Sequence, residues 1–304
     1  MSTTTIRRRK VSASTWVTLK GLAFCSPWIL GLLLIYLYPI LTSFYWSFTD
    51  YRIMNVPVWV GLNNYKIMIS DPVFAMSMKN TLQYVAMWLP SSIVVALGLA
   101  LLLNTKVHGM TFYRSLYYFP VLVPGVASAI VWKWVLDPQW GIVNAMLRSM
   151  GLPTPGWIGS VTWAKPSLIL IALWGVGNSV VIYLASLQDV PRSLYDAAEV
   201  DGANIWQRIW HVTVPMITPT ILFNMIIGMI GAFQTFTIPY VMTQGTGEPG
   251  QTLLFYSMVL YRQAFLYLQM GMGATMAWVM LVFILILTGI VFSTTDRWVY
   301  YGGA

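Results

Sequence analysis

Six long apolar runs constrain this chain more than any other feature of its sequence. Each run is close to the roughly 20 residues that an α-helix needs to cross the hydrocarbon core of a bilayer. Charged residues make up only 9% of the chain, whereas they make up about 25% of an average soluble domain. We therefore predict an all-α integral membrane protein with six transmembrane helices. The runs occupy residues 22–46, 82–104, 115–136, 167–187, 216–240 and 272–292.

Basic residues predict the orientation of these helices, because Lys and Arg near the ends of a span favour the cytoplasmic side. A basic cluster at residues 7–10 places the N-terminus inside, and six spans then return the C-terminus to the same side. The first run contains Cys25 and is followed by no A-x-A-like cleavage site, which indicates a retained span rather than a signal peptide. The predicted parts are a basic cytoplasmic segment (1–20), one six-span domain (21–296) with a cytoplasmic loop (189–215), and a cytoplasmic tail (297–304).

The distribution of charge argues against several classes of function. The net charge of +8 is concentrated beside a span, which favours contact with anionic lipid head groups over nucleic-acid binding. His108 and His211 have no Cys or His neighbours at ligand spacing, so no metal site is predicted. Inside the spans the charged side chain is Lys133, which we expect to pair with Asp137 at helical spacing. The buried acids that proton-coupled or sodium-coupled carriers use are therefore missing.

Outer connections of roughly thirty residues link the first span to the second, the third to the fourth and the fifth to the sixth. They mix turn signals with apolar stretches such as residues 255–266, so short helices or folded caps are predicted there. The chain has no fixed-period repeat and no G-x-x-x-x-G-K-[ST] motif. Because that motif cradles phosphates, its absence predicts that the chain has no ATPase site of its own.

A polar segment at residues 192–215, RSLYDAAEVDGANIWQRIWHVTVP, separates the fourth and fifth apolar runs. Its charges would be costly in hydrocarbon, so we expect the segment to lie in water. Pro191 opens a turn, and Ser193 with Asp196 matches an S-x-x-D capping box. The pattern therefore predicts a short helix that ends near Val200.

The middle of this segment predicts a corner between two helices. Gly202 has no Cβ and can enter the left-handed conformation that commonly ends a helix. A second helix is then predicted over residues 204–214. Glu199 and Asp201 offer carboxylates to basic groups of another protein. By shape alone the segment is more typical of a solvated amphipathic hairpin that packs on the cytosolic ends of the bundle.

The same segment resembles the EAA signature found in permease subunits of ABC importers. The match is Tyr-Asp-Ala-Ala-Glu-Val-Asp-Gly-Ala at residues 195–203, followed by Trp206-Gln207 and Val214-Pro215. Asp196 stands where that family usually has the Glu of its name, which keeps the negative charge. The resemblance implies a coupling helix that docks on a separate ATPase subunit. The implied ATPase-coupling residues are Tyr195, Asp196, Ala197, Ala198, Glu199, Asp201, Gly202 and Ala203.

Over residues 28–296 the chain resembles the binding-protein-dependent sugar permeases, the group that includes maltose, glycerol-phosphate and multiple-sugar uptake systems. Pro39, residues 61–65 (Gly-Leu-Asn-Asn-Tyr) and Asn144 are among the matching positions, whereas residues 243–249 form a longer loop than is usual. The length and the 61–65 stretch are most similar to the first of two paired permeases. The family implies a type I importer permease fold in a bacterial or archaeal cell membrane. Its implied partners are a second homologous permease, two ATPase subunits that carry the ATP and Mg, and an extracellular sugar-binding protein.

The resemblance also implies substrate contacts on the fourth and fifth spans. Gly228, Ala232 and Thr235 recur at i, i+4 and i+7 and so share one helix face. Small residues on a membrane helix equally indicate tight helix packing. A neutral polyhydroxylated solute suits spans that lack buried charge, because amides, hydroxyls and aromatic faces can hold it. The implied substrate-binding residues are Trp174, Asn178, Ser179, Asn224, Gly228, Ala232, Gln234 and Thr235.

These features together predict the permease subunit of an ABC importer, which takes up a sugar or oligosaccharide by alternating access. A secondary transporter or channel for a small polar solute is the main alternative, and it would work without any ATPase. A membrane-embedded enzyme would need a nucleophile, an acid–base pair or a metal set at one depth, whereas the nine acidic residues lie almost wholly in loops. We therefore predict no catalytic residue, no metal ligand and no cofactor bound by this chain.

Overall fold

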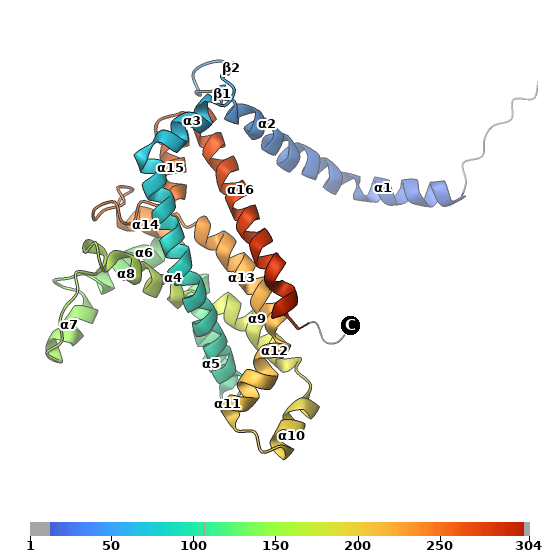
Figure 1. The fold of residues 1–304 in the computed structure, drawn as a ribbon, viewed down its shortest axis with the longest axis vertical. Coiled ribbons are helices and arrows are strands. Elements are labelled where there is room, and N and C mark those ends of the chain that lie inside the picture. Colours follow the sequence, from blue (N-terminus) through green and yellow to red (C-terminus); the bar gives the residue numbers. More distant parts are fainter. Residues whose placement is uncertain (1–12, 106, 301–304) are drawn as a thin grey trace, which may run out of the picture.

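The computed structural model describes residues 13–105 and 107–300 and is mostly helical (Figure 1). The basic cluster at residues 7–10 and the last four residues of the predicted tail lie outside the described residues. The first long helix consists of α1 (Ala13–Gly31), a π-helical turn (Leu32–Leu37) and α2 (Tyr38–Ser47). The other long helices are α4 (Pro72–Leu103), α13 (Thr218–Phe233) followed by α14 (Thr237–Met242), and α16 (Met270–Thr294).

The apolar runs predicted as the third and fourth spans are both broken. In the third, α5 (Met110–Tyr118) with a 3-10 turn (Phe119–Leu122) meets α6 (Gly125–Val135) at a bend of 100°. In the fourth, α8 (Ala164–Trp174) meets α9 (Gly177–Gln188) at a bend of 52°. The described residues thus contain four continuous apolar helices, or six spans if each bent pair counts as one. The predicted helical membrane fold is confirmed, whereas the count of six spans stays a prediction.

Each break has a local cause in the sequence. Pro124 has no N–H to donate and disfavours helical backbone before it, and Val123 is extended with ψ 123°. At the second break, a Cβ on Gly177 would lie 2.8 Å from Cγ2 of Val121 and 2.9 Å from the carbonyl oxygen of Tyr117. Glycine there lets the two breaks touch, so the bends form one contact in the middle of the chain.

Helix α4 is the element on which much of the bundle packs, and it contacts α8, α9 and α13. It begins at Pro72 rather than near residue 82, because the carboxylate of Asp71 accepts a hydrogen bond of 2.8 Å from the Val73 N–H. Ala96 and Ala100 are fully buried in one cluster with Tyr183 of α9. These small side chains leave room for the tyrosine ring between the two helices.

Short elements fill the connections that were predicted to be folded caps, and that prediction is confirmed. They include two strands, three short α-helices, two 3-10 turns and a π-helical turn. Their bounds are β1 (Thr49–Asp50), β2 (Val58–Trp59), α3 (Asn63–Ser70), α7 (Ile142–Ser149), a 3-10 turn (Trp157–Gly159), α15 (Tyr256–Tyr261), a π-helical turn (Arg262–Leu266) and a 3-10 turn (Thr295–Arg297).

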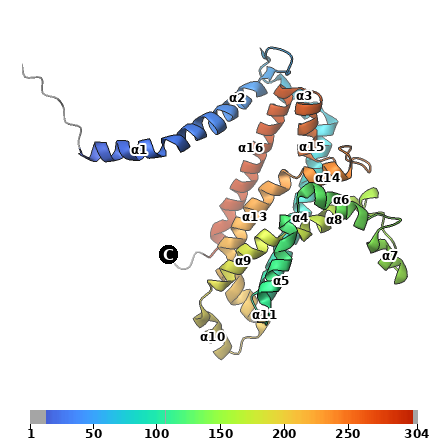
Figure 2. The same ribbon diagram turned by 180° about the vertical axis from the view of Figure 1, so that it is seen from behind.

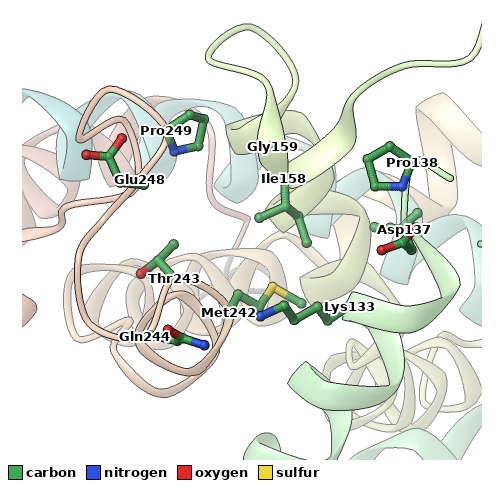
Figure 3. A pocket seen from close by; sticks show the side chains of 11 residues that line it. Lys133, Asp137, Pro138, Ile158, Gly159, Met242, Thr243, Gln244, Glu248 and Pro249 are labelled. Atoms are coloured by element: carbon green, nitrogen blue, oxygen red, sulfur yellow. The ribbon is translucent and has the colours of Figure 1, made fainter.

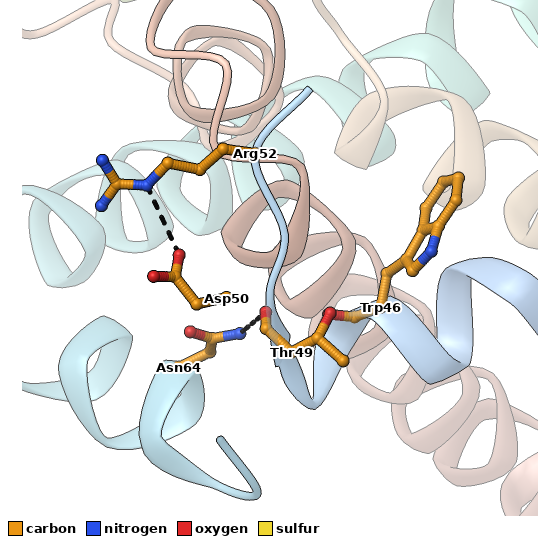
Figure 4. Close-up of polar contacts among 5 residues, drawn as sticks. All are labelled: Trp46, Thr49, Asp50, Arg52 and Asn64. Atoms are coloured by element: carbon orange, nitrogen blue, oxygen red, sulfur yellow. Dashed lines mark hydrogen bonds and ion pairs between the residues drawn. The ribbon is translucent and has the colours of Figure 1, made fainter. Parts of the chain in front are cut away.

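A buried amide joins α2, β1 and α3 (Figure 4). The Nδ2 of Asn64 donates to the carbonyl oxygens of Ser47 and Thr49, at 3.0 and 2.9 Å. The hydroxyl of Thr275 on α16 also donates to the Ser47 carbonyl, at 2.9 Å. These bonds explain why an asparagine stands in the 61–65 stretch, and they tie the end of the first long helix to the last one.

The first long helix projects away from the other helices in both views (Figures 1 and 2). None of its most apolar stretch is buried by the rest of the described chain. Only its last part, α2, packs along α16. An exposed apolar helix of this length is costly in water, so its surface must face lipid or another membrane helix.

Prediction from the helix contacts: replacement of Gly271 by Ala should destabilise the fold by about 1–3 kcal/mol, the usual range for overpacking. A Cβ at this position would lie 2.1 Å from the Thr49 carbonyl oxygen, so α16 would have to move away from β1. Gly289→Ala on the same helix is the matched control, since no atom of the described chain lies within 4 Å of its Cβ. Thermal unfolding of the purified protein in detergent measures both, and equal midpoints would contradict the prediction.

Candidate functional site

The polar segment forms an elbow of two helical arms at one end of the molecule, opposite the β-hairpin (Figure 1). The first arm is α10 (Arg192–Val200), which confirms the predicted helix end. The second arm consists of α11 (Ile205–Arg208), a π-helical turn (Ile209–Thr213) and α12 (Val214–Met216). The term elbow is used below for residues 192–216.

The corner of the elbow is a Schellman motif centred on Gly202. Its N–H donates to the Glu199 carbonyl at 3.0 Å, and the Ala203 N–H donates to the Ala198 carbonyl at 2.9 Å. Gly202 has φ +73°, so its predicted left-handed conformation is confirmed. A side chain there would be strained even though the space around the Cβ position is open.

The capping box lies on the other arm from the one predicted. Pro191 is the N-cap of α10, so Ser193 falls inside the first turn and its side chain caps nothing. The reciprocal bonds are instead made by Asn204 and Gln207. The Gln207 N–H donates to Oδ1 of Asn204 at 2.9 Å, and the Asn204 N–H donates to Oε1 of Gln207 at 2.8 Å.

Two side-chain contacts fix the arms relative to each other. The hydroxyls of Tyr195 and Thr213 lie 3.0 Å apart, and Nη1 of Arg208 lies 3.3 Å from Oε2 of Glu199. The carboxylate of Glu199 was predicted to bind basic groups of a partner protein. Within this chain it also pairs with the guanidinium of Arg208. Its side chain remains largely exposed, so the pair contributes little to stability by itself.

The tip of the elbow exposes apolar side chains that were not among the predicted ATPase-coupling residues. Val200 is 89% exposed and Trp206 is 72% exposed, and Ile205 lies exposed between them. Asp196 and Asp201 are exposed as well. Three large apolar groups in a polar, water-facing segment were the signal that could have identified this surface. Apolar groups at the centre with carboxylates around them are typical of a protein-docking surface.

Three of the predicted substrate-binding residues lie at the break between α8 and α9. Trp174 is the last residue of α8 and is 38% exposed, with its ring edge-on to Trp132 at a centroid distance of 5.8 Å. Asn178 is exposed in the first turn of α9, and Ser179 is half-buried beside it. The break therefore places an aromatic face and an amide close together along the chain.

The five predicted residues on and after α13 differ in their surroundings. A Cβ on Gly228 would lie 3.1 Å from Leu89 and 3.3 Å from Trp88 of α4, which fits close helix packing. Ala232 is buried, and Asn224 is buried with its Nδ2 bonded to the Thr220 carbonyl of its own helix at 3.0 Å. Thr235 is half-buried and Gln234 is exposed, so Gln234 is the most accessible polar group of this set.

A cavity of about 500 Å³ opens between the end of α6, the Trp157–Gly159 turn and the loop after α14 (Figure 3). Lys133 extends toward Met242, and Asp137 lies beside Pro138. The expected pair between Lys133 and Asp137 is absent from the ion pairs of the described residues. Helix α6 ends at Val135, so helical spacing does not continue to Asp137.

Asp137 instead closes the turn that follows α6. Its Oδ1 accepts hydrogen bonds from the Gln139 and Trp140 N–H groups, at 2.8 and 2.9 Å. These two donors hold the pKa of the Asp137 carboxyl below its usual value. Lys133 is thereby left as a cation on the wall of this cavity. In the described residues no group of His, Cys, Asp and Glu could hold a metal ion.

Comparison with known proteins gives a consistent result across sequence and structure. The model of the family described as binding-protein-dependent transport system inner membrane component matches residues 22–299. The probable ABC transporter permease protein YesP of Bacillus subtilis (strain 168) is 41% identical and covers 93% of this chain and 92% of its own. The arabinooligosaccharides transport system permease protein AraP of the same organism is 33% identical, with coverages of 87% and 85%.

A solved structure shares the fold over nearly the whole chain. It is the crystal structure of a bacterial alginate ABC transporter in complex with an alginate pentasaccharide-bound periplasmic protein. One of its chains superposes with a TM-score of 0.77 at 23% identity, covering 93% of this chain and 97% of that chain.

Proposed function

The chain belongs to the family of binding-protein-dependent transport system inner membrane components, and we propose that it forms the transmembrane path for a sugar or oligosaccharide. It is the membrane permease of an ABC importer, and ATP hydrolysis belongs to partner subunits. The proposed assembly adds a second, homologous permease and two copies of an ATPase subunit that bind ATP and Mg. An extracellular solute-binding protein delivers the cargo. The orientation with both termini and the elbow in the cytoplasm is part of this proposal.

The observation that carries the proposal is the elbow with its exposed tip. Val200, Ile205 and Trp206 present apolar surface to solvent, beside the EAA-like residues 195–203. A groove on an ATPase subunit would bury this surface, and its basic groups would meet Asp196 and Asp201. The Schellman corner gives the tip one defined shape, so little conformational entropy is lost when it docks.

The elbow is joined to both candidate substrate helices. Helix α9 runs through the buried Val190 directly into α10, and α12 continues through the fully buried Ile217 into α13. The bond between Tyr195 and Thr213 holds the two arms together. When the ATPase subunits close, the docked elbow would therefore carry α9 and α13 with it, as expected for a rocking change between inward and outward access.

The cargo class is proposed from the polar groups that remain accessible. Trp174, Asn178, Ser179, Gln234 and Thr235 provide an aromatic face, two amides and two hydroxyls, the groups suited to a neutral saccharide. Asn224, Gly228 and Ala232 are less accessible, because Asn224 and Ala232 are buried and Gly228 packs on α4. The name of the 33%-identical relative, an arabinooligosaccharides permease, supports a carbohydrate cargo.

Prediction for coupling: Gly202→Val should lower sugar uptake about tenfold or more while ATP hydrolysis by the partner subunits continues. A β-branched residue at φ +73° costs about 1–3 kcal/mol and would unwind the corner that docks. Gly109→Val is the matched control, because Gly109 also has a positive φ (+78°) and open space around its Cβ but lies outside the elbow. Uptake and ATPase rates of the reconstituted complex measure the effect. Unchanged transport in the Gly202→Val variant, or an equal loss of transport in the Gly202→Val and Gly109→Val variants, would contradict the proposal that the elbow docks on an ATPase subunit.

Prediction for cargo contact: Trp174→Ala should reduce uptake at saturating sugar about tenfold, the change that a lost contact of roughly 1.4 kcal/mol produces. Binding-protein-stimulated ATP hydrolysis should persist, because the elbow is intact. Trp16→Ala, which truncates an exposed tryptophan of the first long helix, should leave uptake unchanged. Transport assays with a panel of sugars on the cognate binding protein provide the measurement. Unreduced uptake by the Trp174→Ala variant would contradict the prediction that Trp174 contacts the transported sugar.

The alternative of a self-sufficient secondary transporter or channel is tested with the chain alone. Liposomes that contain this chain without ATPase subunits should show no uphill uptake of any sugar. Uphill uptake by the chain alone would overturn the proposed function, whatever the outcome for the variants.

A further inference from the structure

A second cavity, of about 610 Å³, lies between α4, the start of α8 and the loop at residues 250–252. It is separate from the cavity in Figure 3 and from the elbow. Lys79 and Lys165 both line it, together with the amides of Asn80 and Gln83. Apolar side chains, including Met87 and Ala86, form the rest of its wall on α4. This combination of cations, amides and apolar wall has no role in the coupling mechanism described above.

Lys165 is fixed in place rather than free in solvent. Its Nζ donates to Oδ1 of Asn80 at 2.9 Å and to Oε1 of Gln83 at 2.5 Å. Asn80 is itself buried, and its Nδ2 donates to the carbonyl oxygens of Gln251 and Leu254, at 2.8 and 3.1 Å. The ammonium is therefore held on the cavity wall by neutral acceptors, and its charge is not cancelled.

Among the residues that the structure describes, no carboxylate forms an ion pair with either lysine. In the described part of the chain the ion pairs are Arg52 with Asp50 and Arg208 with Glu199. Glu248 lines the other cavity, and its carboxylate accepts a hydrogen bond of 2.5 Å from the Gly250 N–H rather than pairing with either lysine. Two cations on one cavity wall repel each other and create a positive potential, which a bound anion would relieve.

The depth of this cavity in the membrane indicates the source of the anion. At 1.5 Å per residue, Lys79 lies about 36 Å and Gln83 about 30 Å along α4 from Leu103. Leu103 is at the elbow end of the helix, since Leu101 and Asn104 share a cavity with Tyr195 and Ile205. The hydrocarbon core of a bilayer is about 30 Å thick. With Leu103 placed at the elbow-side edge of that core, the lysines lie at head-group depth in the opposite leaflet, and the apolar wall toward Met87 lies below them.

We propose that this cavity binds the phosphate group of an anionic phospholipid of that leaflet. The phosphate would sit between the Lys79 and Lys165 ammonium groups, with the amides of Asn80 and Gln83 behind it. The first part of an acyl chain would run along Ala86 and Met87, where Met87 is 44% exposed. This site would be a specific lipid contact formed by α4, α8 and the loop at residues 250–252.

The experiment uses the transporter complex in nanodiscs that contain a photoreactive phosphatidylglycerol, with crosslinked peptides mapped by mass spectrometry. We expect crosslinks to α4 near residues 79–87 and to residues 161–166. Lys79→Gln should lower this yield roughly fivefold, and the Lys79→Gln, Lys165→Gln double variant roughly thirtyfold, since each basic side chain near a membrane surface contributes about a fivefold factor. Lys66→Gln is the matched control, because Lys66 is an exposed lysine of α3 outside the cavity.

Three outcomes would overturn the proposal. One is an unchanged crosslink yield at these segments in Lys79→Gln, a variant that removes no hydrogen bond to Asn80 or Gln83 and so should fold normally. Another is an equal yield from a matched photoreactive phosphatidylcholine, which carries no net charge. The third is displacement of the lipid by millimolar inorganic phosphate, which would assign the cavity to a soluble anion.

Discussion

The contact between the two broken helix pairs, α5–α6 and α8–α9, fixes the relative positions of the helices that carry the candidate site. It depends on the absence of a side chain at Gly177, where a Cβ would press on Val121 and on the Tyr117 carbonyl oxygen. In a bilayer every backbone polar group needs a partner within the protein, so breaks in membrane helices are tolerated only where other segments cover them. Here each break covers the other, and the same contact places Trp174 and Asn178 at the bend.

The elbow follows from this arrangement because α9 begins at that contact and ends at the first arm. A displacement at residues 192–216 can therefore reach the break without crossing a flexible linker. The corner at Gly202, the capping box at Asn204 and the bond between Tyr195 and Thr213 each remove freedom from the elbow. The proposed transmission of force requires such a stiff elbow, since a compliant one would absorb the motion of the proposed ATPase partner.

Sequence patterns predicted the elements whose cause is local. Apolar runs of sufficient length identified the helices near residues 22–46, 216–240 and 272–292, and a glycine after Val200 identified the corner. The breaks were missed because hydropathy continues through Pro124 and Gly177. Each of these residues allows a break locally, but only the packing of one break on the other shows why position 177 must be a glycine. The capping box was assigned to the wrong arm because Pro191 starts α10 earlier than the Ser193 pattern suggests. Whether Gly228 lines a solute path or packs against a neighbouring helix depends on the position of α4. The sequence around Gly228 carries no information about that position.

The first long helix shows that the fold of this chain is incomplete without its surroundings. Its apolar surface is not buried by the other described residues, yet its end is fixed to α16 by Asn64 and Thr275 through the Ser47 carbonyl. A helix anchored at one end and apolar along its length needs lipid or a neighbouring membrane helix over most of its surface. A permease that works with a second permease would have such a neighbour. Within the chain, the direction of this helix is therefore set by these polar bonds and by the packing of α2 on α16, while the rest of its apolar surface needs cover from outside the chain.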